Sequence, residues 1–557
     1  MDRREQQVQV ALGDYFSGQL GRRGFLQRVG LLGMGAVAAG SLLSACSDDS
    51  SSGTAGAPAT ASGEPIKGGT LREGYDRDFT PPDSVNNAWA DPSFYALFEA
   101  VITRDPDGNM VPMLASGFDS SDKGWTFDIP KGLTFQSGDP LTPQAIADFF
   151  NVARDPKQGS NAIFWTPITD VVADGDKVVC KTDGPFQAFQ ETVCTEYSLI
   201  ENIKARKAAG DQWGSKVLDA SGPFTLGAFV PGRSVTVNRW DDYPGSHAPF
   251  ITNKGPAYLD SITWVPITEA SQRAPEIETG NVDAIKNPPP QDIDGLKSNG
   301  DLVVQEFQEL SNFYLQVNMG NTQLGFDDVR VRQAISAAID REAIVKSIFL
   351  GHAVPTYGPV PPGNRWYDSA VEQFNAYDQD KANSLLDEAG WPKGSGGVRS
   401  KNGVQMSFSI MNLTDTTENQ VLQAVTQMLA EVGVQVKIDS KSTAAFWPAL
   451  SDKTVAYAFK WLWSAPIEVV EYFIDFYQPK SARPAKMGQL YADYQKAANE
   501  DEMKSAASAY QNWYAENLPL IPLYTPNTIW VNHKNVIGWQ PNQANIYPYY
   551  HDVWLAK

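Results

Sequence analysis

The chain has few of the side chains on which metal and thiol chemistry depends. Its 557 residues include 3 cysteines and 4 histidines. His247, His352, His533 and His551 are scattered, and none is spaced from another as a pair of zinc ligands would be. The sequence therefore predicts no metal site built by the protein and no cofactor.

The motifs of common enzyme classes are missing as well. The chain has no Gly-x-Ser-x-Gly nucleophile elbow, no phosphate-binding glycine-rich loop followed by Lys and Ser or Thr, and no His-Glu-x-x-His. Glu468 and Glu471 fall on one face of an expected helix that begins after Pro466. They could form the acid/base pair of a secreted hydrolase, but a solvated face or polar contacts to a ligand are the favoured interpretation. No catalytic residue is predicted, and the protein is not expected to be an enzyme.

Positively charged side chains are in the minority. Lys and Arg number 45 against 65 Asp and Glu, which gives a net charge of −20 at pH 7. This surplus argues against nucleic acid or an anionic membrane face as a partner. Beyond residue 43 no apolar run approaches the roughly 18 residues expected of a membrane-spanning helix. The length predicts an exported soluble body of two or three domains.

The N-terminus has the pattern of an export signal. Arg22 and Arg23 precede an uncharged run at 29–43, which at about 15 residues is shorter than the roughly 20 that span a bilayer. The spacing resembles a twin-arginine signal that ends in a bacterial lipobox, Leu-Ser-Ala-Cys at 43–46. By that resemblance residues 1–45 are removed and Cys46 is lipidated. The alternative is an ordinary secretory signal with a coincidental cysteine.

Residues 46–65 are expected to form a flexible tether. After Cys46 this segment is built almost wholly from Ser, Asp, Gly, Ala, Thr and Pro, which bury too little apolar surface to offset the entropy of ordering. Two acyl chains on one cysteine hold a protein stably at a bilayer. We therefore expect the body to be anchored by lipid to the outer face of the cytoplasmic membrane.

Two further cysteines follow in the exported body. Cys180 and Cys194 would lie in a compartment that permits disulfides. A bridge between them would close a loop of about 15 residues and stabilise the fold by about 3 kcal/mol in the chain-entropy model. The sequence favours this disulfide, with two buried free thiols as the alternative.

An aromatic stripe is the feature most suggestive of ligand binding. In the expected strand 455–463, alternation places Tyr457, Phe459, Trp461 and Trp463 on one face. Such a stripe could be plain core. The functional interpretation is a wall of rings that stacks on a ligand. The case for this interpretation is strongest for Trp461 and Trp463 at the C-terminal end of the strand.

Helical and strand-like patterns alternate over residues 310–520, including an expected helix from Val331 to Phe349, and indicate an α/β lobe.

Several short segments then carry a resemblance to a known family. They occur in order along the exported body, at 68–71 (GGTL), 95–99 (YALFE), 138–142 (GDPLT), 221–224 (SGPF), 326–334 (FDDVRVRQA) with 338–341 (AIDR), 385–392 (LLDEAGWP) and 518–524 (LPLIPLY). Together they resemble the extracellular solute-binding proteins of family 5, the receptors of oligopeptide, dipeptide and nickel-type ABC importers.

The resemblance implies an α/β fold of the periplasmic-binding-protein type, of the large type II cluster, with two discontinuous lobes and an extra inserted subdomain. Lobe I would comprise residues 66–86, 200–311 and 520–557, the insertion 87–199, and lobe II 312–519. Two hinge crossings would fall near 312–315 and 518–524. A solute that touches both lobes would stabilise the closed state.

The resemblance also implies partners and a binding site. The receptor, expected to be a monomer, would deliver a peptide or peptide-sized solute to permease subunits driven by ATPases. Cleft contacts are predicted at Trp461, Trp463, Glu468, Asn312, Tyr314, Asn318, Trp89 and Tyr524.

The expected strand 455–463 departs from the peptide-binding pattern. Peptide-binding members usually continue after this strand with an aspartate that pairs with the ligand's α-amino group, whereas this chain has no acid before Glu468. An oligosaccharide receptor of the same family is therefore an alternative to a peptide receptor, and a metal chelate stays open as cargo. Outside transport, the alternatives are a secreted hydrolase and a lipoprotein that senses solute for a signalling partner.

Overall fold

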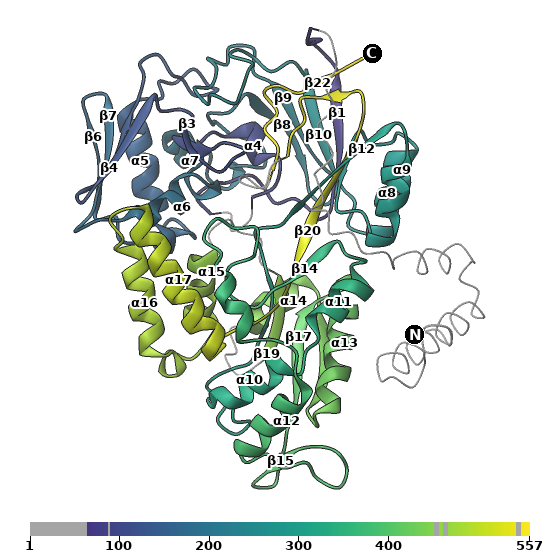
Figure 1. The fold of residues 1–557 in the computed structure, drawn as a ribbon. Coiled ribbons are helices and arrows are strands. Elements are labelled where there is room, and N and C mark those ends of the chain that lie inside the picture. The colour runs from purple at the N-terminus through teal and green to yellow at the C-terminus, as the bar shows by residue number, and fades with distance from the viewer. Residues whose placement is uncertain (1–63, 87–89, 451–455, 461–465, 542–546) are drawn as a thin grey trace.

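The computed structural model describes residues 64–86, 90–450, 456–460, 466–541 and 547–557 (Figure 1). The predicted export signal with Arg22 and Arg23, the predicted lipidation site Cys46, and the predicted contacts Trp89, Trp461 and Trp463 lie outside these residues. Within the described part of the chain, no helix combines the length and the apolar character needed to cross a bilayer.

A mixed sheet of 12 strands runs through both halves of the molecule (Figure 1). The lower half contributes β18 (Gln435–Lys441), β17 (Ser407–Leu413), β19 (Ala456–Lys460), β13 (Phe313–Gln316) and β14 (Ala353–Pro355). The upper half contributes β11 (Ala284–Lys286), β1 (Thr70–Tyr75), β10 (Ser261–Pro266), β9 (Ser234–Arg239), β8 (Phe224–Val230) and β12 (Leu302–Gln308). Strand β20 (Ile521–His533) belongs to both.

Strand β20 connects the two halves. Its residues 527–533 pair with β12, whereas Ile521, Pro522 and Tyr524 pair with β13. The chain passes between the halves a second time at 309–312, from β12 to β13. Two short connections side by side suit rotation of one half against the other, because few residues need to change their backbone angles.

A small antiparallel sheet forms a subdomain beside the upper half. It has the order β4 (Gly117–Ser121), β5 (Gly124–Asp128), β7 (Lys177–Lys181) and β6 (Asp170–Asp174), and it packs on α5 (Pro143–Ala153). Buried Trp125 and Phe127 alternate with half-buried residues along β5, which is typical of a strand with one buried face. Thr142 caps α5 through a bond from Ala145 N.

The predicted disulfide between Cys180 and Cys194 is wrong. Both residues are free thiols, Cys180 on β7 and Cys194 at the end of α6 (Gln190–Val193). Each is buried in the same apolar core, where burial raises the pKa of the Cys194 thiol to about 12 and that of Cys180 even further above its ordinary value. Both sulfurs therefore fill apolar space as neutral thiols.

The lower half carries helices that follow local capping signals. They are α10 (Val329–Ala337), α11 (Arg341–Ile348), α12 (Gln379–Glu388) and α13 (Thr416–Glu431). The expected single helix from Val331 to Phe349 is in fact divided into α10 and α11. Asp340 accepts a bond from Ala343 N and so starts a new helix, just as Asp328 caps α10.

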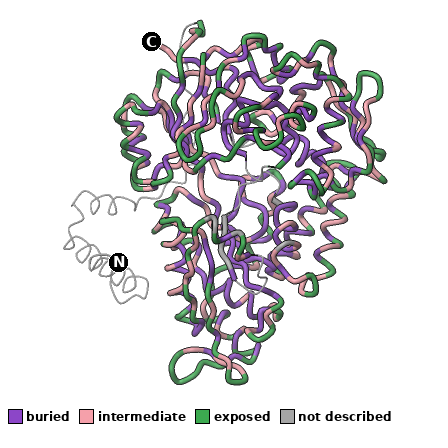
Figure 2. Tube along the Cα trace, turned by 180° about the vertical axis from the view of Figure 1, so that it is seen from behind, coloured by how far each residue is buried: buried purple, intermediate pink, exposed green. Residues whose placement is uncertain are grey.

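Three C-terminal helices join the lower half to the subdomain. These are α15 (Pro466–Tyr477), α16 (Ala485–Gln495) and α17 (Glu500–Asn517), which lie below the small sheet in Figure 1. One apolar core includes residues of both parts, and Phe164 stacks on Tyr472 with ring centroids 6.0 Å apart. Figure 2 shows buried residues running through both halves.

Other elements complete the fold. They include α8 (Ala270–Glu278) and α9 (Ile293–Ser298) in the upper half, and the shorter α4 (Phe94–Leu97), β2 (Ile102–Arg104), β3 (Met110–Pro112), α7 (Ile203–Ala209), β15 (Ser400–Lys401), β16 (Val404–Gln405), α14 (Thr443–Leu450), β21 (Val536–Ile537) and β22 (Trp554–Leu555).

Candidate functional site

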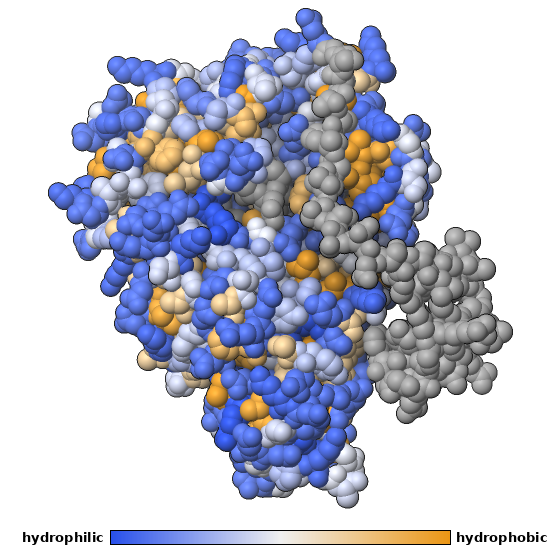
Figure 3. Space-filling model, in the orientation of Figure 1, coloured by the Kyte–Doolittle hydropathy of each residue, from blue (hydrophilic) through white to orange (hydrophobic). Residues whose placement is uncertain are grey.

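A cavity of about 650 Å³ lies between the two halves. From the upper half it is lined by 76–80 after β1, by 287–290 after β11, by Ala90 and Asp91, and by part of α8 and α9. From the lower half and the connecting strand it is lined by Phe349, His352, Leu413, Thr414, Asp415, Thr417, Glu418, Tyr524, Pro526, Asn527 and Ile529. A volume of this size is typical of sites for small organic ligands. The face seen in Figure 3 is mostly hydrophilic, with hydrophobic side chains in separate patches.

Arg273 on α8 holds the upper wall of the cavity together. Its Nε donates to Ile267 O at 2.9 Å, and Nη1 donates to Asn287 O at 2.6 Å. Nη2 donates to Asp76 O at 3.3 Å and to Thr268 O at 3.0 Å. One buried guanidinium thereby binds the ends of β1, β10 and β11, and burial lowers its pKa.

Asn287 links this wall to the connecting strand. Its backbone has a positive φ of 51°, a conformation that Asn adopts more readily than most residues. The side-chain Nδ2 donates to Asp76 Oδ2 at 2.7 Å, and Oδ1 accepts from Ile529 N at 3.1 Å. The carboxyl ends of the upper strands are therefore fixed relative to β20.

Glu306 on β12 gathers three donors at the edge of the cavity. Its Oε1 lies 2.7 Å from His352 Nδ1 and accepts from Asn527 Nδ2 at 2.7 Å, while Oε2 accepts from Lys297 Nζ at 2.8 Å. Burial would raise the pKa of Glu306, but the bonds from these three side chains outweigh it and lower the pKa to about 2. Glu306 is therefore ionised and ties β12 to β20 and to the loop before β14.

The lower wall contains the N-terminus of α13. Asp415 is its cap, and its Oδ1 accepts from Glu418 N at 2.8 Å. Asp415 and Glu418 both line the cavity. The carboxylates of Asp415 and Glu418 thus compensate the partial positive charge at the N-terminus of α13.

Asp91 is the most deeply buried acid of the upper wall. Its side chain is 5% exposed, and Oδ1 accepts from Ser93 N at 2.9 Å and from Ser93 Oγ at 2.5 Å. Burial raises the pKa of Asp91 to about 7, against the opposing effect of the Ser93 bonds and of the charge on Arg77.

Of the predicted contact residues, Tyr524 lines the cavity. Its ring lies between Phe313 and Phe349, with centroids 5.1 and 4.5 Å away. The neighbours of Trp89 in sequence, Ala90 and Asp91, line the same cavity.

The other described contact residues lie elsewhere. Asn312 Nδ2 donates to Gly358 O and Pro359 O, and the Tyr314 hydroxyl donates to Pro359 O at 2.7 Å. Asn318 Oδ1 accepts from Gly320 N at 2.8 Å. These three side chains are buried and hold loops of the lower half.

Glu468, near the start of α15, is also outside the cavity lining. Its side chain is buried in the region where α15 meets the subdomain. Burial, reinforced by the nearby charge of Glu191, raises the pKa of Glu468 to about 8. At neutral pH this carboxyl is therefore largely protonated.

The sequence reasoning missed most of the charged groups of the cavity, namely Asp76, Arg77, Asp78, Asp91, Arg273, Asp415 and Glu418. A signal was present for some of them. Asp76, Arg77 and Asp78 directly follow the first strand, and ligands of α/β proteins lie at the carboxyl ends of strands. Asp415 stands where a helix cap is expected.

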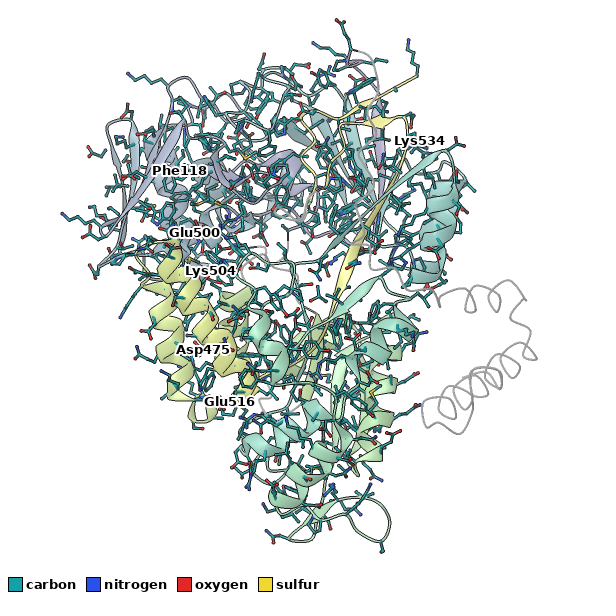
Figure 4. The ribbon with its side chains drawn as sticks, viewed as in Figure 1. Phe118, Asp475, Glu500, Lys504, Glu516 and Lys534 are labelled. Atoms are coloured by element: carbon teal, nitrogen blue, oxygen red, sulfur yellow. The ribbon has the colours of Figure 1, made fainter. Side chains whose placement is uncertain are left out.

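The lower half and the subdomain are also in direct contact. Glu191 Oε1 accepts from Arg104 Nη2 at 2.9 Å within the subdomain and from Trp366 Nε1 at 3.1 Å in the lower half. Arg365 lies 3.4 Å from both Glu191 and Glu500. Figure 4 shows Glu500 at the end of α17 nearest the subdomain that carries Phe118. The two parts are therefore held in contact by buried charge.

Comparison with known proteins explains this arrangement. A family model described as bacterial extracellular solute-binding proteins, family 5 Middle, matches residues 109–483. The chain belongs to this family. Members are receptors that bind a solute without converting it, so the prediction of a non-enzymatic solute-binding protein of an ABC importer is confirmed.

Curated relatives support the same conclusion, one of them over most of the chain. The oligopeptide-binding protein AppA of Bacillus subtilis is 26% identical over 545 residues, which cover 92% of this chain and 96% of AppA. The glutathione-binding protein GsiB of Escherichia coli K12 is 25% identical over 362 residues, which cover 64% of this chain and 66% of GsiB.

Solved structures confirm the predicted fold class. The structure of AppA from Bacillus subtilis in complex with a nonapeptide has a TM-score of 0.75 at 21% identity and covers 89% of this chain and 100% of that one. NikA of Staphylococcus aureus in complex with Ni(L-His)2 has a TM-score of 0.72 at 14% identity and covers 87% and 100%. The fold is the mixed α/β fold of periplasmic binding proteins.

Proposed function

We propose that this protein captures a peptide or peptide-sized solute in the cavity between its halves and hands it unchanged to an ABC permease. The observation that supports the proposal most directly is the cavity itself, whose lining comes from both halves and from β20. A solute that fills it contacts both halves at once and favours the closed arrangement by that difference in contacts.

Peptide is the favoured class of solute. AppA, which matches this chain over 92% of its length, is an oligopeptide-binding protein, and the AppA structure of the same fold holds a nonapeptide. Relatives of the same fold hold quite different solutes, such as the Ni(L-His)2 of NikA. An oligosaccharide stays the second candidate because of the adjacent tryptophans Trp461 and Trp463.

The lipid anchor and the export route are part of the proposal. Arg22 and Arg23 direct export through the twin-arginine route, and acyl chains on Cys46 hold the receptor at the outer face of the cytoplasmic membrane. Residues 46–65 act as a flexible tether that lets the folded body reach the permease while Cys46 stays in the membrane. The lobes, with their insertion at 87–199, would move about the crossings at 309–312 and in β20.

Trp461, Trp463, Trp89 and Tyr524 remain the proposed contacts. Asn312, Tyr314, Asn318 and Glu468, which lie outside the cavity lining, would be contacted only by a solute that extends beyond the cavity. If Trp463 stacks on the solute, Trp463→Ala weakens binding by roughly 1–3 kcal/mol without unfolding the protein. An unchanged affinity removes Trp463 from the site.

Native mass spectrometry of the protein purified from its own host tests the function. The expected result is a co-purified solute of peptide size that is released on denaturation. Incubation with peptide and oligosaccharide pools should raise the melting temperature while product analysis finds every added solute intact. Turnover of any of these solutes would instead establish the hydrolase alternative.

A further inference from the structure

The cavity between the halves has an uneven balance of charge. Its lining contains five carboxylates and two guanidinium groups, together with His352. The carboxylates come from both walls: Asp76, Asp78 and Asp91 from the upper half, and Asp415 and Glu418 from the lower half. A solute held between the walls therefore meets negative charge on each side.

The positive groups of the lining are already engaged by the protein. Arg273 donates to four backbone carbonyls at the strand ends. Arg77 lies beside Asp76, with Nε 3.5 Å from Oδ1, and its charge also acts on Asp91. His352 faces the ionised Glu306. Arg273 also interacts with the charge of Asp415 on the lower wall, but the five carboxylates of the lining still outnumber its two guanidinium groups.

The carboxylates, in contrast, keep accepting capacity. Asp91 is more than nine-tenths buried, and both bonds that it accepts, from Ser93, fall on Oδ1. Among the described residues no donor bonds Asp91 Oδ2, nor Oδ2 of Asp415. Each of these oxygens can therefore accept a bond from a donor on the solute.

An anion does not suit the lower wall. The N-terminus of α13 would otherwise attract negative charge, but Asp415 caps it and Glu418 lies in its first turn. A bare metal ion does not suit the cavity either, because the described residues contain no group of three or more His, Cys, Asp or Glu placed to hold one.

We propose that the solute of this receptor is an organic cation, a peptide or amine whose ammonium or guanidinium groups are bound by Asp91 on the upper wall and by Asp415 and Glu418 on the lower wall. This inference rests on the proposed function and specifies the chemical class of the cargo. Bonds between an ammonium and a carboxylate are among the stronger ones available to a site that excludes water.

Binding of matched tripeptides to the full-length protein tests the inference. Trilysine, trialanine and triglutamate are titrated by calorimetry, with spermidine as a cation that is not a peptide. We expect trilysine to bind about tenfold or more tightly than trialanine, because it adds charge-assisted bonds, and triglutamate to bind most weakly. The preference for trilysine should shrink as salt is added.

Variants of the lining test whether the preference for trilysine arises in the cavity. Asp91→Asn keeps the shape and the acceptor for Ser93. It should lower the affinity for trilysine about tenfold and that for trialanine, which has a single ammonium group, by less. Asp415→Asn, which retains a capping side chain, serves as the second variant if Asp91→Asn folds poorly. Asp211→Asn, exposed and outside the cavity, is the matched control and should change neither affinity.

Other outcomes overturn the inference in distinguishable ways. Equal affinity for the three tripeptides, or a preference for triglutamate, refutes the charge assignment and leaves the receptor function intact. The same holds if the host-purified protein carries a neutral or anionic solute. If the protein binds none of the four probes and carries no solute from its host, the proposed function itself fails.

Discussion

The indole Nε1 of Trp366 donates to Glu191 Oε1 at 3.1 Å, across the junction between the lower half and the subdomain. The same oxygen accepts from Arg104 at 2.9 Å, and the Arg365 guanidinium lies over the Trp366 ring at 4.1 Å. Glu191 and Arg104 are nearly excluded from water, with side chains 4% and 6% exposed. A single buried carboxylate thus bonds residues of both the subdomain and the lower half.

Glu191→Gln should destabilise this junction. The variant keeps an acceptor for Trp366 but removes the carboxylate that bonds the buried Arg104 guanidinium. Breaking a buried pair typically costs 3–5 kcal/mol, so we expect a loss of about 3 kcal/mol in the free energy of unfolding. Urea denaturation measures it. Glu500→Gln is the matched control, because Glu500 pairs with the same Arg365 from a side chain that is 66% exposed, and it should cost less than about 1 kcal/mol. Equal losses of unfolding free energy in both variants would mean that the buried pair contributes no more to stability than the exposed pair.

Glu306 makes the stability dependent on pH in the acid range. Its pKa is about 2 in the folded protein against an ordinary value of 4.5. Since the folded pKa is depressed, the contribution of Glu306 is fully present above pH 4.5 and is lost as the pH falls towards 2. The difference in unfolding free energy between the wild type and Glu306→Gln should therefore be large at pH 7 and shrink steadily below pH 4.5. A difference in unfolding free energy that does not vary with pH would show that the three donors do not lower the pKa of Glu306.

The two body cysteines should behave as unreactive thiols in the native state. Both are buried, and burial raises the pKa of each thiol, so little thiolate is available to react. We expect an alkylating reagent to leave Cys180 and Cys194 unmodified in the native protein and to modify both after denaturation without reductant. Recovery of a disulfide-linked peptide that contains both residues would instead support the disulfide that the sequence predicts.

Cys46→Ala should release the receptor from the membrane. The variant lacks the only predicted attachment point for acyl chains, so we expect the protein in the soluble fraction and no incorporation of labelled fatty acid. Ser47→Ala keeps the cysteine and should stay in the membrane fraction. Replacing Arg22 and Arg23 by Lys should leave unprocessed protein inside the cell. Membrane retention of Cys46→Ala would contradict the lipoprotein assignment.

Tyr524 offers a test of the cavity wall that separates binding from folding. The ring is packed between Phe313 and Phe349, and none of the described residues bonds its hydroxyl. Tyr524→Phe should leave the free energy of unfolding nearly unchanged and weaken solute binding about fivefold if the hydroxyl contacts the solute. Tyr524→Ala should cost about 3–5 kcal/mol of stability, because it leaves a hole in the aromatic packing. An unaltered affinity in Tyr524→Phe removes the hydroxyl from the site.

Much of the architecture could be predicted because its signals are local. The cap Asp328 begins α10, the alternation of Trp125 and Phe127 marks β5, and the segments 326–334 and 385–392 carry the family resemblance. The break between α10 and α11 was missed, although Asp340 is a cap of the same kind. Apolar residues continue on both sides of Asp340, and their helical spacing masked the cap.

The amino-acid order by itself determined the helix caps, the alternating strands and the family, because each depends on residues close together in the chain. Only the tertiary structure decided which side chains share the cavity. Asp91, Arg273 and Asp415 are separated by well over a hundred residues and meet because the strand ends of one half face the start of α13 in the other. It also decided that Asn312 and Tyr314 hold a loop rather than line that cavity, since burial and hydrogen-bond partners depend on segments distant in the sequence.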